Sequence, residues 1–88
     1  MRVRIKVFGQ VQGVFFRHNA KQIAESLNLV GWVKNNPDSS VEAEACGEKE
    51  NLEKFIVWCK KGPSFANVEK VEVNWSNKQV NYESFDVV

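Results

Sequence analysis

The sequence has no long apolar run, only two cysteines and a single histidine, and each shortage excludes a class of protein. Its longest apolar runs span a few residues, far short of the roughly 20 that a membrane-spanning helix requires. One histidine with no nearby Cys–His spacing does not support a zinc site. The N-terminal stretch MRVRIKVFG alternates charged and apolar residues and lacks the apolar segment and cleavage site of a signal peptide. We therefore expect a cytoplasmic protein without a metal or other cofactor.

An excess of charge of either sign is also missing. The 88 residues include 12 Lys and Arg and 11 Asp and Glu, so the formal net charge is +1. This balance gives no electrostatic reason to expect a nucleic acid or a membrane as the partner. A small anionic ligand is compatible with it, because such a ligand needs only one local positive site.

The two cysteines are expected to be reduced. In VEAEAC, Cys46 faces the side opposite to the apolar residues, whereas Cys59 lies on the apolar stripe of a later helical segment. Because the two thiols point into different environments, they are poorly placed to form a disulfide.

Hydrophobic periodicity predicts five strands and two helices. Asn28 is expected to end the first helix in a left-handed backbone conformation, and Gly62–Pro63 to end the second. Val68 and Val71 fall on opposite parities, which predicts a bulge or bend between them. The predicted strands cover residues 2–8, 29–34, 41–45, 71–75 and 85–87, and the predicted helices cover residues 16–28 and 48–61.

This order of elements is typical of an α+β fold, the ferredoxin-like βαββαβ sandwich. It predicts an antiparallel sheet with two helices on one face and a short extra C-terminal strand at an edge. Because this fold carries many unrelated functions, the function has to be argued from a site.

The stretch GQVQGVFFRHNA, residues 9–20, places Arg17 at the start of the first predicted helix. Helix starts favour anions, because their free N–H groups and the helix dipole make that end positive. Gly9 and Gly13 allow the preceding chain to curl with its N–H groups inward, and an arginine fork suits phosphate oxygens. Each feature alone is more often a turn or a solvated side chain, but together they indicate an anion site.

The predicted topology brings an asparagine to the same place. The first two strands run in the same direction with the third between them, so their carboxyl ends and the first helix start share one end of the sheet. Strand parity groups Asn35 with Val33, and Asn36 with Trp32. If the helices cover the face of Val33, Asn35 points beneath the helix start. Since both faces of this strand are apolar, Asn36 is the alternative.

Four runs of the sequence, GQVQGVFFR, LNLVGWVKN, VEAEACG and KKGPSFANVEKVEV, together resemble acylphosphatases. The match is collinear from Val3 to Phe85, and V-Q-G-V-x-F-R followed by G-W-V-K-N is specific. The resemblance implies the ferredoxin-like fold in a single domain over residues 1–88. It also implies a hydrolase that cleaves the carboxyl–phosphate bond of small acylphosphates, without a metal, to a carboxylate and phosphate. We expect this hydrolase to be a monomer.

The same resemblance implies roles for individual residues. Arg17 and Asn35 correspond to the catalytic pair of the family, and Gly9 would shape the entry of the phosphate-binding loop. The main-chain N–H groups implied to bind phosphate are those of Gly13, Val14, Phe15, Phe16 and Arg17.

The sequence departs from the family pattern at two turns. Ser39 and Asn28 stand where the family often has glycine, and both positions are expected to adopt a left-handed backbone. His18, next to Arg17, is a tempting nucleophile, but successive helical residues diverge by about 100°. We therefore expect His18 to lie on the surface rather than beside Arg17.

Two other functions are open on the residues alone. One is a non-catalytic module that binds phosphate or a phosphorylated metabolite. The other is an RNA-recognition-type domain, which shares the strand order but requires exposed aromatic side chains on its central strands. The first strand presents Arg2, Arg4 and Lys6 on its outer face, and we expect no aromatic residue among them.

Overall fold

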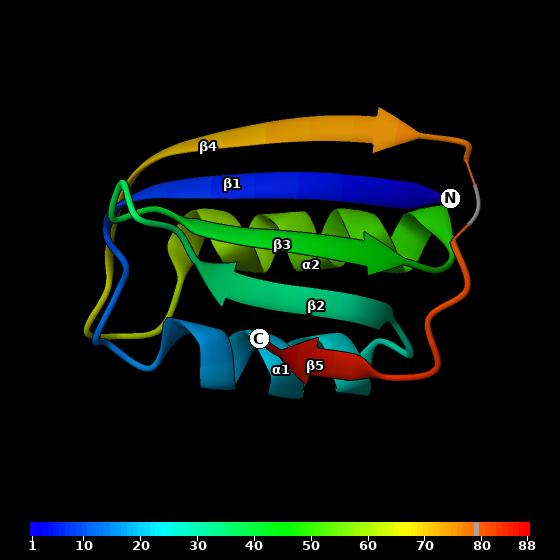
Figure 1. Cartoon of the computed structure of the whole chain (residues 1–88), viewed down its shortest axis with the longest axis horizontal. Helices are drawn as coiled ribbons and strands as arrows, with labels where there is room; N and C mark the ends of the chain where they lie inside the picture. The colour runs from blue at the N-terminus through cyan, green and yellow to red at the C-terminus, as the bar shows by residue number, and fades with distance from the viewer. Residues whose placement is uncertain (79) are drawn as a thin grey trace.

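The computed structural model describes residues 1–78 and 80–88 and places five strands beside two helices (Figure 1). Both helices lie on the same face of the sheet, as predicted. The strands are hydrogen-bonded in the order β4-β1-β3-β2-β5. The elements are β1 (Arg2–Gln10), α1 (Phe16–Ser26), β2 (Val30–Asn35), β3 (Val41–Cys46), α2 (Lys49–Lys61), β4 (Asn67–Ser76) and β5 (Phe85–Val87).

The four longer strands form the predicted antiparallel sheet, and the extra C-terminal strand makes the whole sheet mixed. β1 pairs antiparallel with β3 and β4, and β2 pairs antiparallel with β3, but β5 pairs parallel with β2. The cause is visible in Figure 1, where the chain enters β5 at the same end of the sheet at which β2 begins. The short C-terminal strand therefore adds to the outer edge of β2, at the edge position expected for it, and the sequence had not predicted its direction.

The core lies between the sheet and the helices. Alternate residues of β1 point into it, and Val3, Ile5 and Val7 are at most 1% exposed. The helices contribute residues at spacings of three and four, as the sequence predicted. These are Phe16, Ala20 and Ala24 of α1, and Leu52, Phe55, Ile56 and Cys59 of α2.

The predicted turn conformations are confirmed. Asn28 has φ 57° and Ser39 has φ 76°, both in the left-handed region. Beyond the last turn of α1, the N–H of Leu29 donates to the carbonyl of Ala24 at 2.9 Å, a bond that reaches back over the helix end. The two departures from the family pattern therefore fall where the backbone favours glycine or asparagine.

Gly9 has a different role from the one expected. It lies within β1 at a shift of register against β4, the bulge that the parity of Val68 and Val71 predicted. A Cβ on Gly9 would lie 2.2 Å from the carbonyl oxygen of Asn67, so any side chain here would collide with β4. Gly9 therefore allows the close approach of two strands rather than shaping the loop that follows.

Both cysteines are free thiols. Cys59 is buried in the core, where burial raises the pKa of its thiol. Cys46 is partly exposed at the end of β3. This arrangement agrees with the expectation of reduced cysteines.

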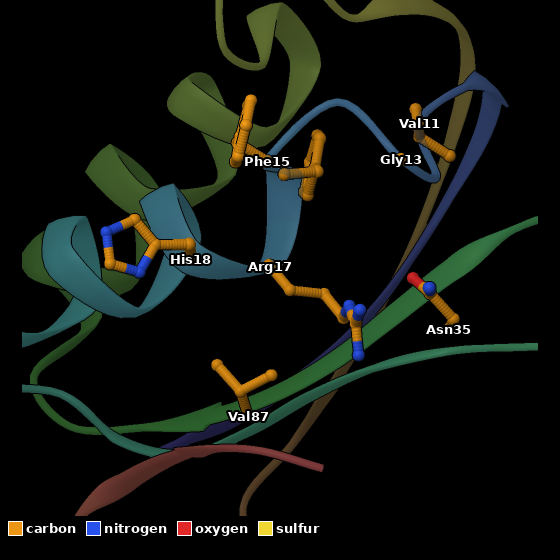
Figure 2. A pocket seen from close by; sticks show the side chains of 8 residues that line it. Val11, Gly13, Phe15, Arg17, His18, Asn35 and Val87 are labelled. Atoms are coloured by element: carbon orange, nitrogen blue, oxygen red, sulfur yellow. The ribbon is translucent and has the colours of Figure 1, made fainter.

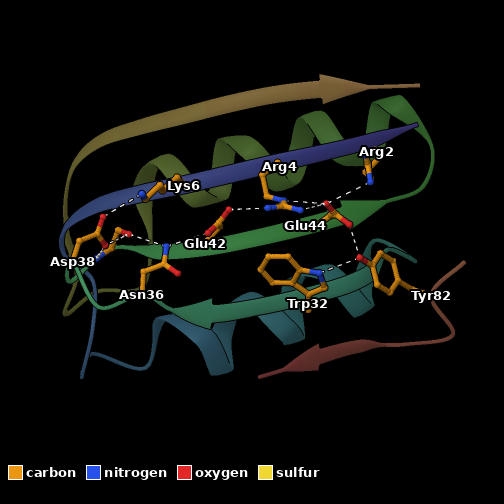
Figure 3. A network of polar contacts seen from close by, with 10 residues as sticks. Arg2, Arg4, Lys6, Trp32, Asn36, Asp38, Glu42, Glu44 and Tyr82 are labelled. Carbon is orange, nitrogen blue, oxygen red and sulfur yellow. Dashed lines mark hydrogen bonds and ion pairs between the residues drawn. The ribbon is translucent and has the colours of Figure 1, made fainter. Parts of the chain in front are cut away.

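The outer face of the sheet carries a network of charged side chains (Figure 3). Arg4 binds Glu44 at 2.7 Å and Glu42 at 2.9 Å, and Lys6 binds Asp38 at 3.1 Å. Burial alone would raise the pKa of Glu44, but hydrogen bonds from Tyr82 and Arg4 outweigh it and hold that pKa below its ordinary value. The outward basic residues of β1 are thus engaged by carboxylates.

This face also carries an aromatic side chain that the sequence interpretation missed. The ammonium groups of Lys6 and Lys70 each lie about 5 Å from the ring centroid of Phe8. The ring is therefore covered by cations of this chain. It does not form the open aromatic platform that an RNA-recognition surface uses.

Candidate active site

A cavity of about 470 Å³ opens at the end of the sheet where β1 and β2 finish and α1 begins (Figure 2). This is the end at which the sequence predicted the site. Its lining comes from the loop after β1, the first turn of α1, the last residue of β2 and the C-terminal strand. The lining residues are Val11, Gly13, Phe15, Phe16, Arg17, His18, Asn35 and Val87.

The loop between β1 and α1 presents unused hydrogen-bond donors. Gly13 has φ 72° and Phe15 has φ 64°, two left-handed residues that curl the chain before the helix. Among the described residues, the first helical bond runs from the N–H of Asn19 to the carbonyl of Phe15, at 3.1 Å. No hydrogen bond in this part of the structure uses the main-chain N–H groups of residues 13–18. They form a positively polarised concavity that suits an anion.

Arg17 adds a full charge to this positive end. The first turn of α1 contains no acidic residue, whereas α2 begins after Glu48 and carries Glu50 in its first turn. The guanidinium of Arg17 extends from α1 toward Asn35 (Figure 2). Across residues 1–78 and 80–88, it takes part in none of the ion pairs or side-chain hydrogen bonds. The local electrostatics therefore favour a bound anion that would pair with it.

The structure separates the two candidate asparagines. Asn35 lies on the face of Val33, beneath the start of α1, and its Oδ1 is buried without a hydrogen-bond partner. Asn36 faces the other side of the sheet, where its amide donates to Ser40 and Glu42 at 3.1 Å. An unpartnered buried oxygen is costly, and a donor in the cavity would relieve that cost. Asn35 is the asparagine that faces the cavity, as parity favoured.

Gln12 is a residue of this site that the sequence interpretation did not single out. Its Nε2 donates to the main-chain oxygens of Asn36 at 2.8 Å and Ser40 at 2.9 Å. These bonds fasten the curled loop to the turn that follows Asn35. The signal in the sequence was slight, a polar residue between a buried valine, Val11, and a glycine.

Two further residues complete the rim of the cavity. His18 is exposed and lies away from the guanidinium of Arg17, as predicted from the helical rotation (Figure 2). Val87 of β5 borders the cavity from the C-terminal strand and is 42% exposed. Sequence reasoning missed Val87 because this residue reaches the cavity through the parallel pairing of β5 with β2, which the sequence did not predict.

Comparison with known proteins shows the family to which this fold belongs. The family model described as acylphosphatase matches residues 3–87. The acylphosphatase of Rubrobacter xylanophilus is 44% identical over 86 residues, which are 98% of this chain and 78% of that protein. The acylphosphatase of Thermococcus kodakarensis is 41% identical over 88 residues, covering 100% of this chain and 96% of the other.

Solved structures give the same result. The crystal structure of acylphosphatase from Bacillus subtilis superposes with a TM-score of 0.96 at 37% identity, covering 99% of this chain and 97% of that one. Full-length HypF, in its phosphate- and nucleotide-bound form, matches with a TM-score of 0.91 at 35% identity, over 99% of this chain but 11% of that protein. With its fold and these relatives in agreement, the chain belongs to the acylphosphatase family, whose activity is the hydrolysis of acylphosphates.

Proposed function

We propose that Arg17 and Asn35 are the catalytic pair and that the main-chain N–H groups of Gly13, Val14, Phe15, Phe16 and Arg17 bind the phosphate of a small acylphosphate. The observation that carries this proposal is the convergence of unused donors, a guanidinium and an unpartnered amide oxygen on one cavity. The N–H donors and the guanidinium are positive, which suits a phosphoryl group. The amide oxygen of Asn35 is free to accept a hydrogen bond.

In this scheme the N–H groups and Arg17 stabilise charge on the three equatorial oxygens of the phosphoryl group, where negative charge gathers during transfer. Asn35 Oδ1 accepts a hydrogen bond from a water molecule and holds it in line with the scissile bond. The water oxygen forms a bond to phosphorus, while the phosphorus–oxygen bond to the acyl group breaks.

The leaving group departs as a carboxylate and carries the bonding electron pair with it. A carboxylate is stable at neutral pH, so the reaction requires no strong general acid. Asparagine cannot act as a base at this pH, and the proton of the water passes to a phosphate oxygen or to solvent. The scheme assigns no step to a metal ion, and we expect turnover to persist in a chelator.

The test is release of phosphate from acetyl phosphate and benzoyl phosphate, above an enzyme-free blank, by the wild type and three variants. We expect Arg17→Ala to lose at least about 100-fold in kcat/KM and to bind inhibitory phosphate more weakly. Asn35→Ala should lose a similar factor but keep its affinity for phosphate. Asn36→Ala, altered on the opposite face, should keep turnover. Full activity of Asn35→Ala would contradict the proposed role of Asn35.

We also propose that residues 1–88 form one domain that works as a cytoplasmic monomer and binds no nucleic acid. Two free thiols fit a reducing compartment, and the carboxylates paired with Arg4 and Lys6 leave little positive charge for RNA. No helix among the described residues is long and apolar enough to cross a membrane. Sedimentation analysis and a salt-dependent RNA filter-binding assay would test these points.

A further inference from the structure

The cavity contains an exposed apolar portion that phosphate binding does not use. Phe15 is 69% exposed at its mouth, and Val87 is 42% exposed on the side of β5. A volume of about 470 Å³ is in the range of pockets that hold small organic molecules and exceeds what a phosphate ion requires. Room is therefore left for the rest of the substrate.

The backbone of Phe15 has a conformation that bulky residues rarely adopt. It precedes α1 with φ 64° and ψ 19°, in the left-handed region. Bulky residues are uncommon there, and such strain concentrates where a site requires it. The strained backbone directs a large apolar side chain to the cavity rather than into the core, although burying that ring would have been favourable.

The direction of the leaving group follows from the proposed roles of Arg17 and Asn35. Attacking water and leaving oxygen lie on opposite sides of phosphorus in an in-line displacement. With the water held by Asn35, the acyl group must project away from Asn35. Figure 2 shows His18 and Val87 on the side of the Arg17 guanidinium away from Asn35, and Phe15 above the guanidinium at the start of α1. All three residues line the same cavity.

We infer that Phe15 and Val87 form a subsite for the acyl group and give the enzyme a preference for acylphosphates with an apolar, above all aromatic, acyl group. This inference rests on the proposed function, because the position of the acyl group is set by water held at Asn35. His18 borders the same subsite but leaves it open to solvent, so that acyl groups of several sizes can enter.

The test compares kcat/KM for benzoyl phosphate with kcat/KM for acetyl phosphate, which differ in the apolar size of the acyl group. Phe15→Asn tolerates the left-handed backbone and removes the ring. We expect it to lower the benzoyl-to-acetyl ratio about fivefold to tenfold, the effect of a few methylene-sized apolar contacts in an open pocket. Val87→Ser should lower the ratio about twofold to threefold by the same argument.

The chain offers a matched control in Phe65, another exposed phenylalanine. It is 76% exposed and does not line the cavity, so Phe65→Asn should leave the ratio unchanged. Because Phe15 also supplies an N–H to the proposed phosphate site, its variant is judged by the ratio and not by the absolute rate. If Phe15→Asn does not fold in a urea titration, Val87→Ser decides the question.

The outcomes separate this inference from the proposed function. Equal benzoyl-to-acetyl ratios in the wild type, Phe15→Asn and Val87→Ser, with both compounds hydrolysed, would overturn the subsite and leave Arg17 and Asn35 in their roles. Failure of the wild type to hydrolyse either compound above the blank would remove the proposed function, and the subsite with it. A ratio that falls in both variants and not in Phe65→Asn supports the subsite.

Discussion

The side-chain amide of Gln12 donates a hydrogen bond to the main-chain carbonyl of Asn36, 2.8 Å away. Gln12 belongs to the loop that presents the free N–H groups, and Asn36 directly follows Asn35. A second bond, to the carbonyl of the buried Ser40 at 2.9 Å, fastens the same amide to the next turn. Two parts of the proposed active site, far apart in sequence, are thus held in register by one side chain.

Gln12→Ala should therefore weaken both the fold and the proposed phosphate site. Two net hydrogen bonds of about 1 kcal/mol each suggest a loss of about 1–2 kcal/mol in the free energy of unfolding. A loop released from the turn should also bind phosphate more weakly, which raises the inhibition constant for phosphate. Urea titration measures the first effect and inhibition of acetyl phosphate hydrolysis the second.

Gln10 provides the control for this prediction. It is an exposed glutamine of β1 that does not line the cavity, so Gln10→Ala should leave stability and phosphate inhibition unchanged. If Gln12→Ala lost stability but kept the wild-type inhibition constant for phosphate, Gln12 would stabilise the fold without positioning the phosphate site.

Substitution of the two neighbouring asparagines should have opposite effects: Asn35→Ala should reduce activity more than stability, and Asn36→Ala should reduce stability more than activity. Asn35→Ala removes a buried oxygen that has no partner, so the free energy of unfolding should change by less than about 0.5 kcal/mol or increase. Asn36→Ala removes hydrogen bonds to Ser40 and Glu42 and should cost about 1–2 kcal/mol. Urea titration of both variants, beside the hydrolysis assay, checks the contrast. A stability loss in Asn35→Ala as large as that in Asn36→Ala would show that Asn35 serves the fold.

The sequence was sufficient to predict features that depend on local chemistry and periodicity. Alternation located the strands, and asparagine at position 28 marked a left-handed helix end that the structure shows. Once the element order was known, the strand directions and strand order of this topology brought Arg17 and Asn35 to one end of the sheet. Their convergence on one cavity could therefore be predicted without side-chain coordinates.

What could not be predicted depends on neighbours that are distant in the sequence. The parallel direction of β5 depends on the end of the sheet at which the chain enters this strand, and Val87 reaches the cavity because of that direction. The anchoring role of Gln12 requires the position of the turn after β2. Gly9 looked like part of a phosphate-binding loop, but its backbone is needed for a bulge against β4.

Asp38 should make stability depend on pH in the acid range. Hydrogen bonds from the hydroxyl and N–H of Ser40, with a further one from Lys6, lower the pKa of Asp38 from 3.8 to about 2. A carboxylate with a lowered pKa in the folded state stabilises above its unfolded pKa. That stabilisation is lost as pH falls through the folded pKa, because the unfolded chain then binds more protons.

We therefore expect the free energy of unfolding to fall between about pH 4 and pH 2, and to fall less steeply in Asp38→Asn. Part of the slope should persist in that variant, because hydrogen bonds also lower the pKa of Glu44. Urea titrations across this range measure the slope. Glu53→Gln, which removes an exposed carboxylate without an ion pair among the described residues, is the control and should keep the wild-type slope.

Ser39→Gly should stabilise the protein. Ser39 is exposed with φ 76°, a conformation that costs a non-glycine residue roughly 1–2 kcal/mol and glycine none. Glycine also raises the conformational entropy of the unfolded chain, which offsets part of this stabilisation. We therefore expect a net increase of about 0.5–1 kcal/mol in the free energy of unfolding. Ser64→Gly, at an exposed serine without a positive φ, should instead lower stability slightly, because it adds only the entropy cost. Urea titration of the two variants decides the point, and equal effects of both would contradict the assignment of backbone strain to Ser39.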